Sequence, residues 1–524
     1  MTNNKHRKTG GFRVKISLHQ QLSRRERRVA QRIEKKNWSG QSPMIAPPSI
    51  EFELSDRIQA VNAGGLGVIQ QMVKQLGLAA SINTVCPILK MHLPYTEADH
   101  VLNIAYNLLA GGSCLEHLEL RRKDEGYLNA LGAERIPDPT TAGDFCRRFN
   151  SFDVMALQES FHDARLKVWS QQPDSFFDQA VIEGDGTQVE TFGERKEGMA
   201  MNYKGEWGYH PLVITLANTR EVLYVWNRSG SRPSHERAHI FFDRAIDVCR
   251  RSGFRRVLLK GDTDFSQSRH LDRWHNDNVQ FIFGYDATKN LIEIAENLDK
   301  SHWKELKRKT RATDNPRARR PNTKEQVVVE KSYQNKRLEK EFVAEFSYSP
   351  GLCSNTYRMV VLRKEVSVSK GQQKLFDDSP YFFYITNVPK EEQSAEEIVF
   401  GANKRCDQEN IISQLKGMGA LAAPLHSTIS NGAYMAMTTL AWNLKCWLAL
   451  SLKEAGPPKQ KAKRQAEKHR LIRLDFSTFR QALILIPTQI VRTARRLIYR
   501  LLAWSESLDT LFRLYESVSI PLRN

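Results

Sequence analysis

The alternation of strands and helices between residues 177 and 289 constrains the fold more than any other feature of the sequence. In order, it consists of a strand in AVIEGDGTQVETFG, two β-rich runs in GYHPLVITLANTREVLYVWN, a helix in HIFFDRAIDVCRRSG, a strand in RVLLKGD, a helix in SRHLDRWHND and a strand in VQFIFGY. The TLANTRE segment supplies the turn between the two β-rich runs. This order predicts an α/β fold with a mixed sheet flanked by helices.

The segments before and after these residues show different patterns of expected helices and strands. A chain of 524 residues is too long for one compact core and suggests about three or four domains. We expect a basic, flexible tail over 1–50, a helical module over 51–172, the first part of the α/β domain over 173–289, a β-rich insertion over 290–395, the second part of the α/β domain over 396–456, and a basic linker with a C-terminal helical region over 457–524. The insertion is expected because several short strands, including EFVAEFSYS and YRMVVLRKE, interrupt the pattern.

The helical module contains a candidate DNA-reading helix. In PDPTTAGDFCRRFNSF, Pro and Thr stand at a helix start and are followed by Arg147 and Arg148. A helix-turn-helix would place such a pair against DNA, whereas a plain packing helix would hold it in solvent. The sequence leaves both interpretations open.

Basic residues are concentrated in three segments. The chain has 78 Lys and Arg against 59 Asp and Glu, a formal net charge of +19. Met1–Lys36 holds 12 basic against 2 acidic residues, Ser301–Lys324 holds 9 against 2, and Lys459–Arg473 holds 7 against 1. The remainder is mildly acidic, so the pattern favours a nucleic-acid-binding protein over one whose basic runs only aid solubility.

Cysteine spacing and hydropathy exclude several other classes. The seven cysteines form no C-x-x-C pair, which argues against a disulfide framework and a thiolate zinc site and fits a reducing cytosol. The basic N-terminus lacks the apolar run of a signal peptide. The most apolar stretch, YMAMTTLAWNLKCWLALSL, is interrupted by Asn443 and Lys445, so we expect no membrane span.

Carboxylates stand at the ends of two expected strands. RVLLKGDTDFS ends on Asp262 and Asp264, and VIEGDGT carries Glu183 and Asp185 on one strand face. Each could simply mark a polar turn. Because two strands of one expected sheet share the pattern, Asp185 and Asp262 could instead meet and hold a divalent cation.

A third candidate carboxylate is Glu409, in RCDQENIISQLKG. On a helix, Arg405, Glu409 and Lys416 lie close to one face, which places the carboxylate between two cations. A surface helix held by ion pairs would look the same. Three carboxylates among cations suit phosphoryl transfer, because two Mg²⁺ ions held by carboxylates stabilise the attacking and leaving oxygens while cations hold phosphates.

Taken together, these motifs resemble the DDE transposases of bacterial insertion sequences. The residues that carry the resemblance are DGT on the first strand, GD on a later strand, a β-rich insertion, and the spacing of Arg405, Glu409 and Lys416. PDPTTAGDF, YHPLVITLANTREVLYVWNRSGS and ANKRCDQENIISQLKG also match. Within these transposases the chain resembles the insertion-sequence-thirteen-eighty group, in the superfamily with a Tyr-Arg-Glu-Lys signature, over about residues 90–500.

This resemblance implies an RNase H-like catalytic fold, split by the insertion, that cuts DNA at inverted-repeat ends and joins the 3′-OH ends to target DNA. It implies that Asp185, Asp262 and Glu409 are catalytic and bind two Mg²⁺ ions, with Mn²⁺ as a substitute, and that Arg405 and Lys416 contact phosphate. Its implied partners are double-stranded DNA and a second copy of the chain in a homodimer. It further implies a cytoplasmic, nucleoid-associated protein of bacteria.

One signature position differs. The Tyr should lie three residues before Arg405, where this chain has Ala402, so a hairpin intermediate is not implied here. Trp303 could stack on an extruded base or be an ordinary packed Trp. Two alternatives to a transposase are an RNase H-like nuclease without strand transfer and a catalytically silent DNA-binding regulator; the three intact carboxylates disfavour the regulator.

Overall fold

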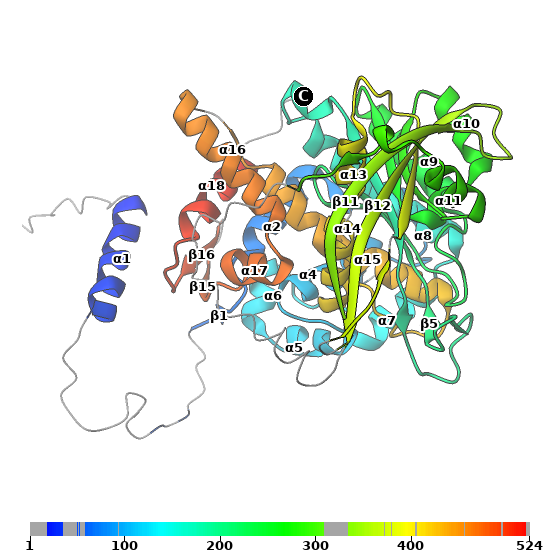
Figure 1. Ribbon diagram of the computed structural model, residues 1–524. Coiled ribbons are helices and arrows are strands. Elements are labelled where there is room, and N and C mark those ends of the chain that lie inside the picture. The colour runs from blue at the N-terminus through cyan, green and yellow to red at the C-terminus, as the bar shows by residue number, and fades with distance from the viewer. Residues whose placement is uncertain are drawn as a thin grey trace, which may run out of the picture.

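The computed structural model of the protein is built around a large mixed sheet with helices on both sides (Figure 1). It describes residues 18–34, 50, 52, 58–92, 94–308, 334–370, 373–378, 380–403, 406–454, 456–493 and 496–519. Arg405, most of the tail expected over 1–50, and residues 309–324 of the second basic segment lie outside the described residues.

The main sheet has ten strands. In spatial order they are β10 (Lys304–Glu305), β11 (Gln334–Tyr348), β12 (Tyr357–Lys370), β14 (Tyr381–Thr386), β9 (Gln280–Tyr285), β8 (Val257–Gly261), β2 (Ala180–Gly186), β6 (Leu212–Leu216) and β7 (Glu221–Trp226), with β13 (Gln373–Asp378) paired to β12. Strands β2, β8 and β9 are parallel, whereas β6 is antiparallel to β2 and to β7. The mixed α/β fold expected from the strand and helix order is therefore present.

The β-rich insertion continues this sheet. β14 pairs with β9 in antiparallel register, with Phe383 opposite Tyr285, and β12 and β11 extend the sheet outward from β14. Because every strand from β9 outward is hydrogen-bonded to its neighbour, the insertion lengthens the central sheet at its β9 side.

Helices cover both faces of the parallel strands, which explains why β8 is buried along its whole length. α9 (Ala238–Arg251) packs on β2, β6, β7 and β8, and the Gly184 face of β2 meets Phe242 of α9. Side chains alternate between faces along a strand, so Glu183 and Asp185 face the other way. That opposite face is covered by α13 (Ala395–Asn403) and α14 (Cys406–Gly417).

The region before the sheet is helical. Its helices are α2 (Leu66–Leu76), α3 (Leu78–Val85), α4 (Glu97–Leu109), α5 (Leu118–Arg122), α6 (Glu125–Leu131), α7 (Pro139–Arg147) and α8 (Ser151–Trp169), with a 3₁₀ turn η1 (Leu115–His117). Local signals set their starts: Thr96 and Asn150 form capping boxes, and Asp138 caps α7 ahead of Pro139.

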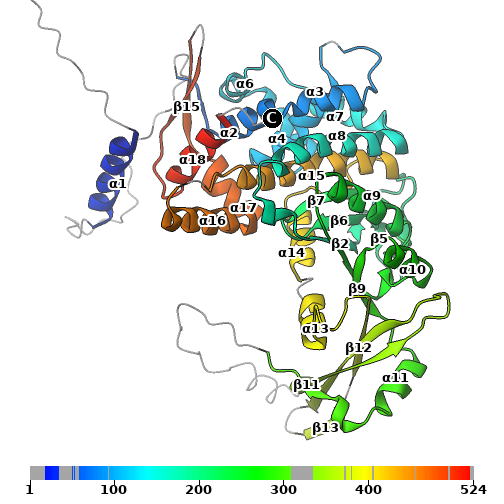
Figure 2. The same cartoon turned by 90° about the horizontal axis from the view of Figure 1, so that it is seen from above.

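Helix α15 (Thr428–Leu450) joins this helical region to the sheet (Figure 2). It is buried from Ser430 to Leu450 and packs on β7, α4, α7 and α8. α15 is mostly apolar because it is buried between the helical region and the sheet. Within the part of the chain that the structure describes, no helix is long and apolar enough to cross a membrane.

Polar residues of the helices complete the open edge of β7. Asn443 of α15 accepts from Val222 N at 2.9 Å and donates to Val222 O at 2.9 Å. Gln158 of α8 accepts from Val225 N at 2.8 Å. These amides replace a neighbouring strand, so the edge is buried with its backbone groups paired.

A buried ion pair ties α8, β7 and α15 together. Arg165 and Glu221 are both 0% exposed, and Arg165 Nε donates to Glu221 Oε1 at 2.9 Å. Trp169 Nε1 and Trp447 Nε1 donate to the same carboxylate at 2.8 and 2.7 Å, and Arg165 Nη2 donates to Val222 O at 2.8 Å. Glu221 therefore has both oxygens satisfied by three different side chains.

Lys445 of α15 gives a prediction for the pH dependence of stability. It is buried, and its Nζ donates to Ile472 O at 3.0 Å. Burial lowers the pKa of Lys445 from 10.5 to about 8. Between these values the unfolded state binds more protons, so Lys445 makes the free energy of unfolding rise with pH, by up to about 1.4 kcal/mol per pH unit. We expect the free energy of unfolding of Lys445→Met, measured by urea titration between about pH 8 and 10.5, to lack this rise. A variant whose free energy of unfolding rises with pH as in wild type would contradict the lowered pKa of Lys445.

The expectation of a helical C-terminal region is wrong over residues 488–501. There β15 (Thr488–Arg492) and β16 (Leu497–Leu501) form a hairpin, and β15 pairs with β1 (Ala60–Val61), a short strand in the module expected to be helical. Thr488 and Ile490 are buried while Gln489 and Val491 are not, a period of two that suits a strand. Pairing with β1, far away in sequence, decides the structure.

The remaining elements complete the fold. The helices are α1 (Leu18–Glu34), α10 (Ser268–Asn276), α11 (Lys289–Glu296), α16 (Pro458–Arg473), α17 (Phe476–Phe479) and α18 (Leu508–Ser519), with the 3₁₀ turns η2 (Asp174–Phe177), η3 (Thr263–Phe265) and η4 (Lys300–His302) and the short π-helix η5 (Arg480–Ile484). A small sheet consists of β3 (Val189–Glu190), β5 (Trp207–Tyr209) and β4 (Ala200–Met201). α1 lies within the segment expected to be a flexible tail, but it is helical, and its Arg25 donates to Leu501 O at 3.0 Å.

Candidate active site

Asp185 lies on β2 near its carboxyl end. The strand continues to Gly186, so Asp185 and Gly186 do not form a hairpin turn. A Cβ at Gly186 would lie 2.8 Å from His210 Cε1, so glycine allows this ring to approach the strand. Asp185 is half-buried, with His210 next to the residue that follows it.

Asp262 lies directly after β8 in extended conformation. Its Oδ1 accepts from Asp264 N at 3.0 Å and caps the short turn η3. Gly284 of β9 is adjacent, because a Cβ there would lie 2.9 Å from Thr263 N and 3.1 Å from Asp262 C. The strand end is therefore a turn, as the simpler interpretation expected, but Asp262 is also held in place beside β9.

The register of the parallel strands brings the two aspartates level. Glu183 of β2 is the Cα partner of Lys260 of β8. Asp185 and Asp262 are each two residues further along, and parallel strands lie about 4.8 Å apart. Both side chains therefore project from adjacent strands toward the face that carries α13 and α14.

Gln408 fixes the helix of the third candidate carboxylate to this sheet. Gln408 is 0% exposed; its Nε2 donates to Val213 O at 3.1 Å, and its Oε1 accepts from Thr215 Oγ1. Val213 is the β6 partner of Asp185. The exposed Glu409 follows Gln408 directly, so the helix that carries it is anchored one strand away from Asp185.

Lys416, at the end of α14, lies within electrostatic reach of Asp185. Lys416 is exposed overall, but burial around its ammonium group lowers its pKa, while the carboxylates of Glu190, Glu206 and Asp185 raise it. Burial lowers the pKa of His210, and the positive charges of Arg228 and Lys416 lower it further. A cation and an imidazole thus lie around the two level aspartates.

Other expected DNA contacts lie elsewhere. Arg147 is paired with Asp144 at 2.6 Å, and Arg148 is an exposed residue at the end of α7, which packs on α15 (Figure 2). Trp303 is half-buried with the Arg363 guanidinium 4.7 Å from its ring centre. It precedes β10, six strand positions or roughly 29 Å from β2. The structure does not bring these three residues to the aspartates.

Sequence reasoning missed Gln408, His210 and Arg228. Arg228 is buried and donates to four backbone carbonyls, of His210, Pro233, Ser234 and Glu236, which fixes the loop beside His210. The available signal for Gln408 was its place in the buried stripe of α14, with Ile411, Ile412 and Leu415. A polar residue in such a stripe needs a buried partner.

The donor set at this edge suits a hard divalent cation. Two carboxylates on adjacent strands offer oxygen ligands and negative charge, which Mg²⁺ prefers. Within the described ranges, no three His, Cys, Asp or Glu side chains converge closely enough to hold a metal ion, so Glu409 does not join the two aspartates in this arrangement. The fit is therefore that of a site with two protein carboxylates at its centre and a third nearby.

Comparisons with known proteins identify the family. The family model described as transposase DDE domain group 1 matches residues 56–519. The chain therefore belongs to this family and is a transposase. A search among curated proteins gives no match. Among solved structures, the chain is similar to piggyBac transposase in a synaptic complex with hairpin DNA, at 8% identity and a TM-score of 0.34, over 88% of this chain and 86% of that chain.

Proposed function

We propose that the protein is a cut-and-paste transposase of the insertion-sequence-thirteen-eighty group, with Asp185, Asp262 and Glu409 as its catalytic carboxylates. The observation that carries this proposal is the level placement of Asp185, near the end of β2, and Asp262, directly after the parallel strand β8. The order β7-β6-β2-β8-β9, two antiparallel pairings followed by two parallel ones, supports an RNase H-like core.

Each residue has a distinct role in this proposal. Asp185 and Asp262 would hold Mg²⁺ at the carboxyl ends of these strands, and Glu409 of α14 would be the third carboxylate of the set. When bound, the two ions stabilise the attacking and leaving oxygens of phosphoryl transfer. Lys416 binds a phosphate beside the scissile one, and the resemblance gives Arg405 the same role.

The wider reaction follows from this assignment. Water attacks the phosphodiester at the element's inverted-repeat end and releases a 3′-OH. That 3′-OH then attacks a phosphodiester of target DNA, which joins the element to the target strand and displaces the target's own 3′-OH. Because two ends must be held together, the working form is a homodimer on double-stranded DNA, acting at the bacterial nucleoid. Ala402 replaces the signature Tyr, so the reaction need not pass through a hairpin.

A joining assay separates this function from its alternatives. A labelled duplex carrying the element's end and an unlabelled target duplex are incubated with the full chain, with Mg²⁺ or with EDTA. Joined products that require Mg²⁺ are expected. Nicks without joined products would show a nuclease, and binding without either product would show a DNA-binding regulator.

Gln408 gives a prediction about positioning. Gln408→Leu keeps the size of the side chain but removes both hydrogen bonds to β6, so α14 and Glu409 lose their fixed distance from Asp185. We expect cleavage to fall about 10- to 100-fold. The change should be in the rate at saturating DNA, because Gln408 is buried and touches no DNA.

The half-buried Gln414 of the same helix provides the matched control. It contacts Asp475 and Phe476 of the C-terminal region and not the sheet, so Gln414→Leu should cleave within a few-fold of wild type. Equal rates for wild type and Gln408→Leu would show that Glu409 does not depend on this anchor.

A further inference from the structure

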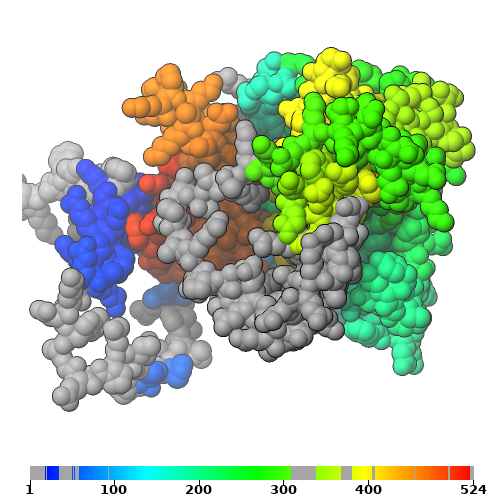
Figure 3. All heavy atoms as spheres, in the orientation of Figure 1, coloured from blue at the N-terminus to red at the C-terminus, as the bar shows by residue number. Residues whose placement is uncertain are grey.

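Helix α16 projects from the body of the molecule. Its residues are mostly exposed, and only Lys468, Leu471 and Ile472, near its C-terminal end, are buried. Figures 1 and 3 show it in orange, standing clear of the sheet at the upper left. A helix of 16 residues held at one end presents most of its surface to solvent.

Four cations form a stripe along the exposed side of α16. At about 100° per residue, Lys463, Arg470 and Arg473 lie within roughly 40° of Lys459, whereas the buried residues lie on the opposite side. The stripe covers 14 helical steps, or about 21 Å. All four residues are exposed.

Among the described residues, these four cations differ from several other surface cations in lacking acidic partners. Within the described ranges, none of the four has an acidic partner within ion-pair distance, although Lys468 on the buried side pairs with Glu454. On α9, by contrast, surface arginines are paired: Arg250 with Asp277, and Arg251 with Asp247. The stripe on α16 therefore presents uncompensated positive charge in a fixed row.

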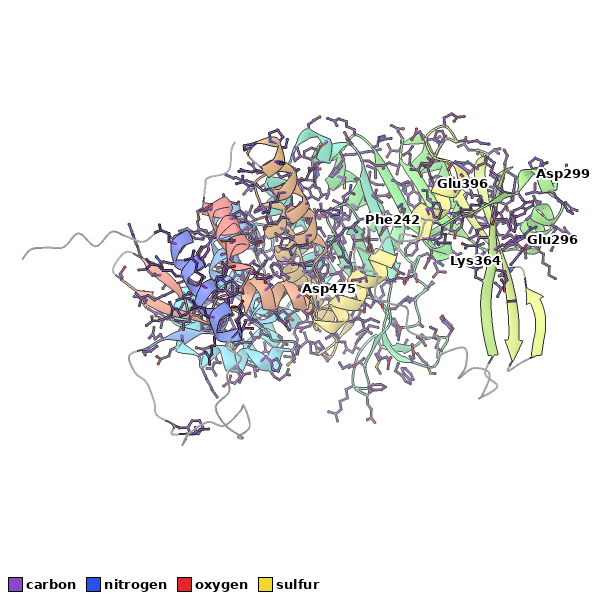
Figure 4. All side chains as sticks on the ribbon, turned by 60° about the vertical axis from the view of Figure 1, so that its left-hand side comes forward. Phe242, Glu296, Asp299, Lys364, Glu396 and Asp475 are labelled. Atoms are coloured by element: carbon purple, nitrogen blue, oxygen red, sulfur yellow. The ribbon has the colours of Figure 1, made fainter. Side chains whose placement is uncertain are left out.

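The stripe has a fixed position relative to the helix of Glu409. Arg220 Nη1 donates to Arg473 O at 3.1 Å, and its Nη2 donates to Asn410 Oδ1 at 3.2 Å. Gln414 Nε2 donates to Asp475 Oδ1 at 2.7 Å, and Figure 4 shows Asp475 beside the yellow helix α14. The C-terminal end of α16 is thus attached to α14 one residue away from Glu409.

We propose that the stripe of Lys459, Lys463, Arg470 and Arg473 binds the phosphate backbone of the DNA duplex on which the candidate active site acts. This deepens the proposed function and rests on it. Phosphates along one strand recur about every 3.4 Å per base pair, so a 21 Å row spans about six base pairs. Lys and Arg contacts to phosphate position a duplex without reading its sequence. The stripe would hold the part of the duplex that extends away from the carboxylates of the candidate active site.

Salt-dependent binding tests this surface. The full chain is titrated against a fluorescent duplex of arbitrary sequence, at salt concentrations from about 50 to 200 mM, and anisotropy gives Kd at each. For the variant Lys459→Gln, Lys463→Gln, Arg470→Gln, the slope of log Kd against log salt should fall by about 0.9 for each phosphate that the protein no longer neutralises, up to about 2.7. The three residues are exposed, so thermal melting should match wild type.

A matched control lies on the same helix. Lys461 is exposed but sits about 200° around from Lys459, away from the stripe. Lys463→Gln should reduce the slope by about 0.9, Lys463→Arg should restore it, and Lys461→Gln should leave it unchanged. Equal effects of Lys461→Gln and Lys463→Gln on the slope would show that only the net charge of the helix matters, which would contradict DNA binding by the stripe.

Two further outcomes separate this inference from the proposed function. If the triple variant had the wild-type slope of log Kd against log salt, the stripe would not be a DNA-binding surface, even if wild type joins DNA ends. The same would follow if the substitutions changed only the oligomeric mass of the protein measured by light scattering. A wild type that never cleaves, but whose slope depends on the stripe, would refute the proposed chemistry and leave the stripe standing.

Discussion

Replacing Asp262 by Ala is expected to lower DNA cleavage and joining at least ~10³-fold while DNA binding persists. The reason is that Asp262 and Asp185 lie level on adjacent strands, so removing one carboxylate removes half of the central ligand pair. Single-turnover cleavage of a labelled duplex measures the loss, and anisotropy measures binding.

Two further variants isolate the carboxylate from the turn that it caps. Asp262→Asn keeps an acceptor for Asp264 N but loses the charge, so it should be as inactive as Asp262→Ala. Asp264→Ala removes an exposed carboxylate from the same turn and should remain within about tenfold of wild type. If Asp262→Asn remained active, or if Asp264→Ala were inactive while Asp262→Asn was not, Asp262 would not be the catalytic carboxylate.

Replacing Glu221 by Ala is expected to destabilise the fold by about 3–5 kcal/mol. The change leaves the Arg165 guanidinium buried without a counter-charge and leaves two Trp N–H groups without their acceptor. Because the network joins α8, β7 and α15, the loss should appear in global unfolding. Urea denaturation followed by tryptophan fluorescence measures it.

An exposed ion pair provides the control. Asp277 pairs with Arg250 at 2.8 Å, but both side chains are well exposed, so Asp277→Ala should cost less than about 1 kcal/mol. A similarly small effect of Glu221→Ala would mean that water reaches Arg165 and that the network does not hold the helices to the sheet.

Local patterns predicted the strands and helices that carry the candidate site. RVLLKGD and VIEGDGT became β8 and β2 because apolar runs bounded by turn residues suit buried strands, and TLANTRE became the turn between β6 and β7. The roles of Asp185, Asp262 and Glu409 stay predictions, although the strand register brings the two aspartates together. From the sequence, the proximity of Asp185 and Asp262 could be suggested only because both expected strands end in an aspartate after apolar residues.

Long-range pairings were not accessible in the same way. The hairpin β15–β16 was expected to be helical because its Arg and Leu residues suit either structure, and its strands are selected by their pairing with each other and, for β15, with β1. The role of Gln408 depends on the carbonyl of Val213, which lies 195 residues away in the chain. Such contacts arise from the packing of α14 on β6, which no local window contains.

Metal binding by the two aspartates tests the central claim most directly. Mn²⁺ added to the full chain without DNA is followed by EPR of the free ion, for wild type, Asp185→Asn, Asp262→Asn and Asp264→Asn. We predict that wild type and Asp264→Asn bind Mn²⁺ and that each of the other two variants loses most of this binding. Unchanged binding in Asp185→Asn and Asp262→Asn would contradict the assignment of this sheet edge as the metal site of the transposase.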